Sequence, residues 1–263
     1  MKRYLMLTRS VLLSGVNHRV HFIAMSLGNI IYVFLIYYLW KSIYTNSSQL
    51  NGLSFGQAFV YLAMGSSLFW LFTTWVEYDM AQGIVNGTIV KHLLLPLDLQ
   101  LHYFFNALGY ITNNLLLILF PALMMLSLLF KASVPIGWNL IWFVLSVAFS
   151  FVITFHIDYI IGLLSFYTES IWGISIIKEV IVTTFSGAVV PLQFFPGVMR
   201  SIVEWLPFQT IYHTPLMLLI TPQPSFTKVA VMFLNQLFWM LVCVGLAKFI
   251  YNRAIRKITI NGG

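Results

Sequence analysis

Two ionisable side chains, His156 and Asp158, stand inside a long apolar run in the segment FHIDYIIG. A charge within a lipid bilayer is costly, so it normally faces a cavity or a partner. The pair could line a substrate path or carry protons. Alternatively, Asp158 lies near the cytosolic end of its own predicted helix and forms a hydrogen bond to a neighbouring helix. Residues two apart point to different faces of a helix, which weakens a shared His–Asp dyad.

Motifs for other chemistry are missing from the sequence. It has no G-x-x-x-x-G-K-[ST] phosphate loop, no Rossmann glycine fingerprint, and no C-x-x-C, H-E-x-x-H or G-x-S-x-G motif. The histidines are scattered, at 18, 21, 92, 102, 156 and 213, and do not cluster with other metal ligands. We therefore expect no nucleotide, metal or other cofactor on this chain and no catalytic residues.

The composition indicates a membrane protein. Of 263 residues, 60% are hydrophobic and only 8% charged, with a mean hydropathy of +0.89, whereas about a quarter of the residues in soluble domains are charged. These values exclude a water-soluble enzyme and a disordered chain. The apolar runs lack the alternation of barrel strands, which favours a helical bundle. The single cysteine, Cys243, lies in an apolar run and cannot form a disulfide within the chain.

Six apolar runs approach the roughly 20 residues with which a helix crosses a bilayer. They cover residues 22–40, 56–76, 103–130, 140–164, 171–190 and 229–251, and the third contains Pro121. Residues 1–20 read as an amphipathic helix on the membrane surface, or alternatively as a disordered basic tail. We find no soluble domain, so residues 1–263 form a single all-α membrane domain.

The distribution of basic residues predicts the orientation. The net charge of +7 could mark a nucleic-acid-binding protein, but eight of the fourteen basic residues flank the first and last apolar runs. With both termini in the cytosol, cytosolic segments hold ten basic residues and outer segments four, in accord with the positive-inside rule. This count places Lys178 in the cytosol, although it could lie a turn or more inside the fifth span.

Two connections are longer than a turn. The cytosolic one, 77–102, contains Gly83, Gly87 and Pro96 and a short amphipathic piece at 89–95. The outer one, 191–228, is unusually apolar and holds six prolines. Short proline-broken apolar pieces favour a hairpin that re-enters the outer leaflet with its backbone buried against protein. A seventh span at 211–220 competes with this interpretation but is short and contains Pro215.

Two asparagines in the third predicted span, Asn113 and Asn114, are further polar candidates. They either line a cavity or provide hydrogen bonds between helices, as polar side chains in membrane proteins commonly do. Gly65, Ser66 and Ser67 in the second span would permit close helix packing. Aromatic residues near the span ends are typical of an interfacial belt or, alternatively, of a drug-binding pocket.

Three segments resemble the membrane subunits of ABC-2-type exporters, which are six-span permeases of similar length. Residues 84–97, IVNGTIVKHLLLPL, resemble the glycine-then-LLxPL stretch of that family. The run SGAVVPLQFFP at 186–196, followed by LPF at 206–208 and Pro215, resembles its signature after the fifth span. The tail RKITINGG at 256–263 resembles its basic end closing on Gly-Gly. No family motif covers His156 or Asp158.

The resemblance implies an interfacial N-terminal helix, a cytosolic coupling helix and an outer re-entrant hairpin. It also implies a second permease, identical or a sister subunit, and two cytosolic ATPase subunits that hold ATP and Mg. The residues expected to contact the ATPase are Gly83, Gly87, Lys91, His92 and Pro96. The residues expected to form the outer gate are Pro191, Phe195, Pro196, Leu206, Pro207, Phe208 and Pro215.

The sequence therefore predicts the permease subunit of an ATP-driven exporter, working by alternating access in a bacterial plasma membrane. Its apolar walls favour a hydrophobic or amphipathic cargo such as a drug, a peptide or a lipid-like molecule. A carrier or channel that uses Asp158 and His156 as a proton relay is the alternative, and it would transport without an ATPase. An intramembrane enzyme is a third possibility, with only the His156/Asp158 pair as candidate machinery.

Overall fold

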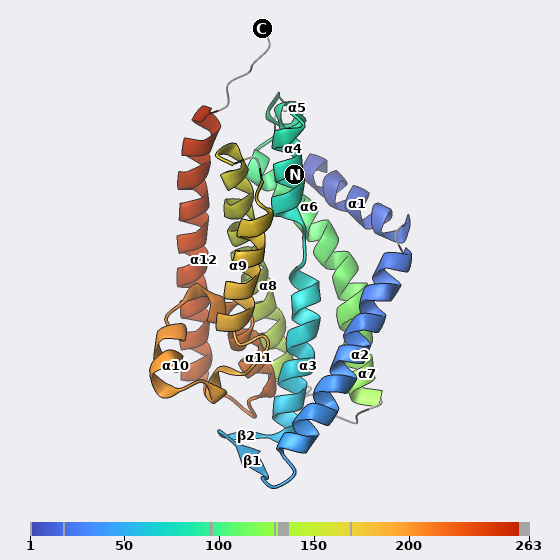
Figure 1. Ribbon diagram of the computed structural model, residues 1–263, viewed down its shortest axis with the longest axis vertical. Coiled ribbons are helices and arrows are strands. Elements are labelled where there is room, and N and C mark those ends of the chain that lie inside the picture. The colour runs from blue at the N-terminus through green and yellow to red at the C-terminus, as the bar shows by residue number, and fades with distance from the viewer. Residues whose placement is uncertain are drawn as a thin grey trace.

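The computed structural model describes residues 2–17, 19–94, 97–128, 130, 137–168 and 170–257. Within them, helices run along one long axis (Figure 1). They are α1 (Lys2–Asn17), α2 (Arg19–Ile43), α3 (Phe55–Phe72), α4 (Val76–Val85), α5 (Ile89–Leu94), α6 (Leu99–Asn114), α7 (Phe120–Leu128), α8 (Trp138–Leu163), α9 (Trp172–Phe185), α10 (Gly197–Val203), α11 (His213–Ile220) and α12 (Phe226–Ala254). A π-helix covers Leu115–Leu119, short 3-10 helices cover Leu164–Phe166, Leu192–Phe194, Pro207–Thr210 and Ile255–Lys257, and β1 (Gln49–Leu50) pairs with β2 (Leu53–Ser54).

Five helical segments in the described part of the chain are long and apolar enough to cross a membrane. They are Ile23–Ile43, Phe55–Val85, Leu99–Leu128, Trp138–Phe166 and Phe226–Ala254. Each overlaps one of the six predicted spans. The protein is therefore a multi-pass helical membrane protein.

The remaining predicted span, 171–190, corresponds to α9, a helix of 14 residues. A helix of that length extends about 21 Å, less than the roughly 30 Å of a hydrocarbon core. After α9 the chain turns at Gly187, which has a positive φ of 79°. The six-span count therefore stays a prediction. Helix α11, with eight residues, is likewise too short for the competing seventh span.

The second span continues further than the sequence indicated. Helix α3 ends at Phe72, the chain is extended or left-handed through Trp75 (φ 58°), and α4 then runs to Val85. The stretch Val76–Val85 is helical and falls within the candidate span Phe55–Val85, while the start of the cytosolic connection at Glu77 stays a prediction. The backbone break that separates α3 from α4 places Glu77 inside the bundle.

Pro121 explains the irregularity of the third span. Proline lacks an N–H and its ring clashes with the carbonyl four residues earlier, here that of Leu117. The helix accommodates it with the π-helix Leu115–Leu119 just upstream. The Ser26 hydroxyl on α2 donates a hydrogen bond to the Leu117 carbonyl oxygen. A side chain from the neighbouring helix thus satisfies the acceptor that Pro121 leaves open.

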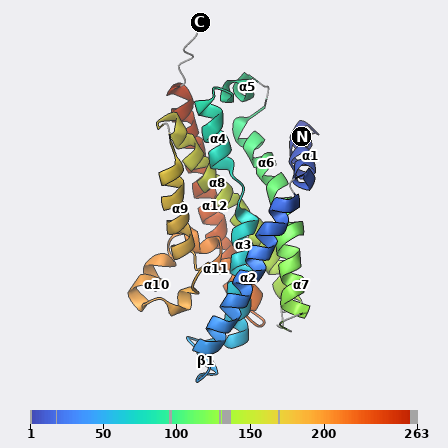
Figure 2. The ribbon, with the colours of Figure 1, turned by 45° about the vertical axis from the view of Figure 1, so that its right-hand side comes forward.

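Helix α1 lies against α6 in both ribbon views (Figures 1 and 2). Two glycines allow this approach: a Cβ at Gly109 would lie 2.6 Å from the Val11 Cβ, and one at Gly15 would meet the Asn113 side chain. The Thr8 hydroxyl donates to the Phe105 carbonyl oxygen at 2.7 Å. The described part of the predicted N-terminal segment is therefore a packed helix, which argues against a disordered tail.

The segment between α9 and α12 folds back at the end of the bundle opposite the C-terminus (Figure 1). Gln236 of α12 anchors it by donating to the carbonyl oxygens of Thr210 (2.9 Å) and Ser146 (3.2 Å) and to the Ser150 hydroxyl (3.2 Å). The Ser146 hydroxyl donates in return to Gln236 Oε1 at 2.9 Å. One buried amide thereby joins α12, α8 and the 3-10 helix Pro207–Thr210.

Helix α3 occupies the centre of the bundle. Tyr61, Phe59, Leu62, Met64 and Leu68 on it are all fully buried. Helices α2, α9 and α12 instead expose many large apolar side chains on their outer faces. Cys243 on α12 is buried. An apolar outside around a tightly packed central helix is the arrangement expected in a lipid environment.

A buried ion cluster and its cavity

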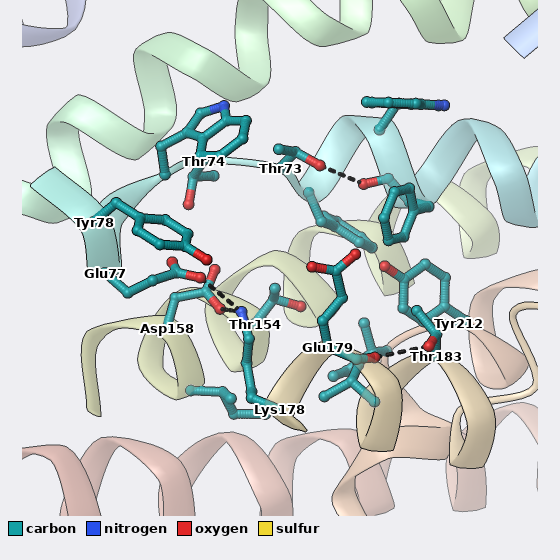
Figure 3. Close-up of a pocket in the computed structure, with 17 residues that line it drawn as sticks. Thr73, Thr74, Glu77, Tyr78, Thr154, Asp158, Lys178, Glu179, Thr183 and Tyr212 are labelled. Carbon is teal, nitrogen blue, oxygen red and sulfur yellow. Dashed lines mark hydrogen bonds and ion pairs between the residues drawn. The ribbon is translucent and has the colours of Figure 1, made fainter. Parts of the chain in front are cut away.

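Three charged side chains from three helices meet inside the bundle. Lys178 Nζ on α9 lies 2.8 Å from Glu77 Oε1 on α4 and 2.7 Å from Asp158 Oδ1 on α8. Figure 3 shows the ammonium group between the two carboxylates. The carboxylate side chains are only 7–8% exposed. A single cation thus bridges two anions that the chain carries 81 residues apart (158 − 77).

Local sequence explains why these residues can meet. Glu77 stands in the first turn of α4, just after the break at Trp75. Gly162, one turn beyond Asp158 on α8, lets α4 approach closely, because a Cβ there would lie 3.2 Å from the Glu77 Cα and 3.1 Å from Met80 Sδ. The break and the glycine therefore bring the two carboxylates to one side of α9.

The cluster is costly to disrupt. Removing charges from water costs several kcal/mol per ion, and mutual attraction compensates only when the geometry is good. Both contacts of Lys178 are short and charge-assisted. Lys178 faces two acidic side chains, so the cluster contains one more acidic than basic group. Lys178 ties α9 to α4 and α8 through this arrangement.

A cavity of about 340 Å³ opens beside the cluster. Its walls come from the end of α3, the break, the start of α4, the middle of α8, α9 and the residues before α11. Its aromatic lining consists of Phe69, Trp70, Phe72, Trp75, Tyr78 and Tyr212. The cavity is therefore largely apolar, with a charged floor formed by Glu77, Asp158, Lys178 and Glu179.

Two polar side chains of the cavity wall have no partner. No hydrogen bond or ion pair joins the Glu179 carboxylate to another residue in the described ranges. Figure 3 shows this carboxylate directed into the cavity rather than toward Lys178. Thr74 is 2% exposed, and its Oγ1 has no hydrogen-bond partner among the described residues. A buried hydroxyl without a partner is unfavourable.

The predicted His156/Asp158 pair separates in the structure. Asp158 joins the ion cluster and lines the cavity. His156 lies elsewhere, with its Nδ1 donating to the Val152 carbonyl oxygen (2.6 Å) and its Nε2 accepting from Gln100 Nε2 (2.8 Å). The two side chains make no contact that would support a proton relay.

Asn113 and Asn114 do not line this cavity and instead form hydrogen bonds between helices. Asn113 Nδ2 donates to the Val11 carbonyl oxygen at 3.3 Å and so holds α1. Asn114 Nδ2 lies 3.0–3.3 Å from the carbonyl oxygens of Trp70, Leu71 and Thr73. Asn114 thereby supplies a donor to carbonyls at the end of α3, of which that of Trp70 also accepts from the Thr73 N–H.

The predicted coupling segment forms a turn and a short helix at the end of the bundle where the C-terminus lies (Figures 1 and 2). Gly87 has a φ of 70°, a conformation that favours glycine. Gly83 is buried in the last turn of α4, and α5 carries Lys91, which is exposed, and His92. The His92 ring centroid lies 4.5 Å from that of His102 on α6. Pro96 and residues 258–263 lie outside the described residues.

The prolines of the predicted outer gate mark the ends of short helices. Pro191 precedes the 3-10 helix Leu192–Phe194, Pro196 caps α10 and Pro207 begins the 3-10 helix that Gln236 anchors. Pro215 stands in the first turn of α11, where no N–H donor is needed. The gate residues Phe195, Leu206 and Phe208 are half-buried within the same segment.

The sequence alone did not identify four residues of the site: Thr74, Glu77, Lys178 and Glu179. One feature of the sequence could have indicated the ion cluster. Lys178 stands in the apolar run 171–190, and a lysine there requires an acidic partner. The chain has only seven acidic residues, so the set of partners was small. That Glu77 is one of the partners of Lys178 follows from the break between α3 and α4, which the sequence does not reveal.

The comparison with protein families agrees with this architecture. A search of curated proteins gives no match. The family model described as "ABC-2 family transporter protein" matches residues 30–262, which is most of the chain and includes every residue of the ion cluster. The chain therefore belongs to the ABC-2 transporter family.

Proposed function

We propose that this chain is the permease subunit of an ATP-driven exporter, coupled to a separate cytosolic ATPase. As a member of its family, the chain is a multi-pass membrane component of an ABC transporter and not the ATPase itself. The family match over residues 30–262 is the observation that carries the proposal. The absence of a phosphate loop from the sequence supports this division of labour.

The helix pair α4–α5 supports the route by which an ATPase acts. Helix α5 buries Ile89 and exposes Lys91, whereas α4, joined to it through Gly87, carries Glu77 into the ion cluster. A partner that contacts α5 would therefore act on α4, which forms an ion pair with α9 through Glu77 and Lys178. An ATPase can shift the permease between two states only through contacts that differ between them.

The remaining parts of the proposal follow the family architecture. The complex contains two ATPase copies, which hold ATP and Mg, and a second permease, identical or a sister chain. Both termini face the cytosol of a bacterial plasma membrane, and six spans rearrange by alternating access. The outer segment between α9 and α12 opens and shuts the exit for a hydrophobic or amphipathic cargo.

Affinity purification of the tagged chain in mild detergent, followed by mass spectrometry and an ATPase assay, tests this function. We expect a phosphate-loop ATPase to co-purify, and the double variant Gly87→Ala/Lys91→Glu to lose it. Lys228→Glu at the start of α12 is the matched charge-reversal control and should retain the ATPase. Purification without any ATPase across several detergents would contradict the proposal.

A further inference from the structure

The charges of the cavity do not balance. Its wall contains three carboxylates, those of Glu77, Asp158 and Glu179, and one ammonium group, that of Lys178. Lys178 contacts the first two and leaves Glu179 without a counter-ion in the described structure. The cavity wall therefore holds two more acidic than basic side chains, and the one without an ion-pair partner among the described residues, Glu179, is exposed. Such a field repels anions and favours a cation.

A second, independent observation points to a ligand at the same place. Thr74 lies in the break between α3 and α4 and lines the cavity. Its hydroxyl is buried without a partner among the described residues, and Figure 3 shows it directed toward the interior of the site. A bound N–H group would satisfy this oxygen. Native structures rarely leave such groups unpaired.

The rest of the wall selects what kind of cation fits. Aromatic side chains from α3, the break, α4 and the segment before α11 surround the charged floor. Aromatic faces attract cations and also pack against apolar ligands. A divalent metal ion would need several ligands, and the described residues contain no group of three His, Cys, Asp or Glu side chains able to hold one.

We propose that this cavity binds an amphipathic organic cation, namely a protonated amine attached to an apolar body. The ammonium group donates to the Glu179 carboxylate, a further N–H reaches the Thr74 hydroxyl, and the apolar body packs against the aromatic wall. Lys178 holds Glu77 and Asp158 in place, so that Glu179 supplies the free charge. This inference rests on the proposed function, in which the cavity belongs to the transport route.

Binding can be measured on the full chain in lipid nanodiscs without any ATPase. Dansylcadaverine is a suitable probe, because its dansyl group reports binding by fluorescence and its alkyl chain ends in an ammonium group. The matched analogue, N-dansyl-6-aminohexanoic acid, has the same fluorophore and spacer but ends in a carboxylate. We expect saturable binding of the cation and at least about tenfold weaker binding of the anion.

Two variants locate the site. Glu179→Gln removes the free charge at an exposed side chain without partners, so the fold should be retained, and it should weaken dansylcadaverine binding by about tenfold or more. Thr74→Val keeps the side-chain shape and should weaken binding about threefold to tenfold. Glu204→Gln, which alters an exposed carboxylate outside the cavity, is the control and should bind as the wild type does.

The result that overturns the inference is equal binding of the two dansyl probes, or wild-type affinity in Glu179→Gln. This outcome is distinguishable from failure of the proposed function, because the nanodisc assay does not involve the ATPase. Cation binding without a co-purifying ATPase would contradict the exporter and leave the site intact. ATPase coupling without cation binding would contradict only the site.

Discussion

At the scale of single residues, Lys178 has the largest expected effect on stability. It is the one cation between two buried carboxylates, and its removal leaves both unpaired. We expect Lys178→Met to lower the free energy of unfolding by about 3–5 kcal/mol, the usual result of breaking a buried ion pair. Thermal unfolding of the purified protein in detergent measures the effect.

A neutral version of the whole cluster provides the counter-test. Combining Lys178→Met with Glu77→Gln and Asp158→Asn removes the uncompensated charges, and we expect most of the lost stability to return. The exposed pair Arg200–Glu204 is the comparison, since Arg200→Met should change stability by less than about 1 kcal/mol. If Lys178→Met unfolds like the wild type, the ion cluster does not stabilise the fold.

Gly187 is a second residue at which a substitution should lower the stability of the fold. Its φ of 79° disfavours any side chain, and an added Cβ would lie 2.7 Å from the Tyr61 hydroxyl, which pairs with His213 Nδ1 at 3.0 Å. We expect Gly187→Ala to destabilise the protein by about 1–3 kcal/mol. Gly245→Ala on α12, where a Cβ meets nothing within 4 Å, should be neutral or slightly stabilising in the same unfolding measurement.

At the scale of elements, Gln236 holds the segment between α9 and α12 against the bundle. It bonds α8 and the 3-10 helix Pro207–Thr210 through a fully buried amide. Gln236→Leu would leave the Ser146 hydroxyl and the Thr210 carbonyl short of a partner. We expect faster hydrogen exchange over 207–220, with exchange in α3 unchanged.

The neighbouring residue offers the control for that experiment. Asn235 lies beside Gln236 on α12, is half-buried and makes no side-chain hydrogen bond to another residue in the part of the chain that the structure describes. Asn235→Leu should therefore leave exchange over 207–220 as it is in the wild type. Equal acceleration in both variants would show that leucine disturbs α12 generally, and that Gln236 has no special role.

The elements also show what a sequence can and cannot reveal. Apolar run length is a local property, so four predicted spans overlap candidate spans with ends that differ by at most four residues, whereas the second ends nine residues before Val85. Gly87 stands in a positive-φ turn and Ile89–Leu94 is helical, as the glycine and the amphipathic pattern indicate. The break after Phe72 has no glycine or proline to mark it, and Trp75 adopts a left-handed conformation that is uncommon for a bulky residue. Because no residue marks this break, the sequence places Glu77 in the cytosolic connection and does not predict the ion cluster.

At the scale of the whole molecule, the basic residues predict which side of the membrane each end faces. The test uses single cysteines in a Cys243→Ala background and a membrane-impermeant maleimide. We expect Lys228→Cys to react in intact cells, and Lys91→Cys and Arg253→Cys only after permeabilisation. The native thiol is buried, so its removal should leave the fold unchanged.

The pattern of reaction also decides the span count. In the six-span arrangement, Lys228 and Arg253 lie on opposite sides of the membrane, and so do Lys91 and Lys228. Labelling of Lys91→Cys in intact cells would reverse the orientation. Labelling of Lys228→Cys only after permeabilisation would mean that α9 does not carry the chain across.

The break between α3 and α4 gives the molecule a lever. Its fulcrum is at Trp75, and its arm is the ten-residue helix α4, about 15 Å long, with α5 at the far end. A rotation of about 10° at the fulcrum moves that far end by about 2.6 Å, whereas Glu77, about 3 Å along the arm, moves by about 0.5 Å. If α4 pivots at Trp75, a push on α5 would reach the ion cluster as a smaller displacement with a larger force. Short, direct ion pairs to Lys178 are suited to transmit such a displacement to α9.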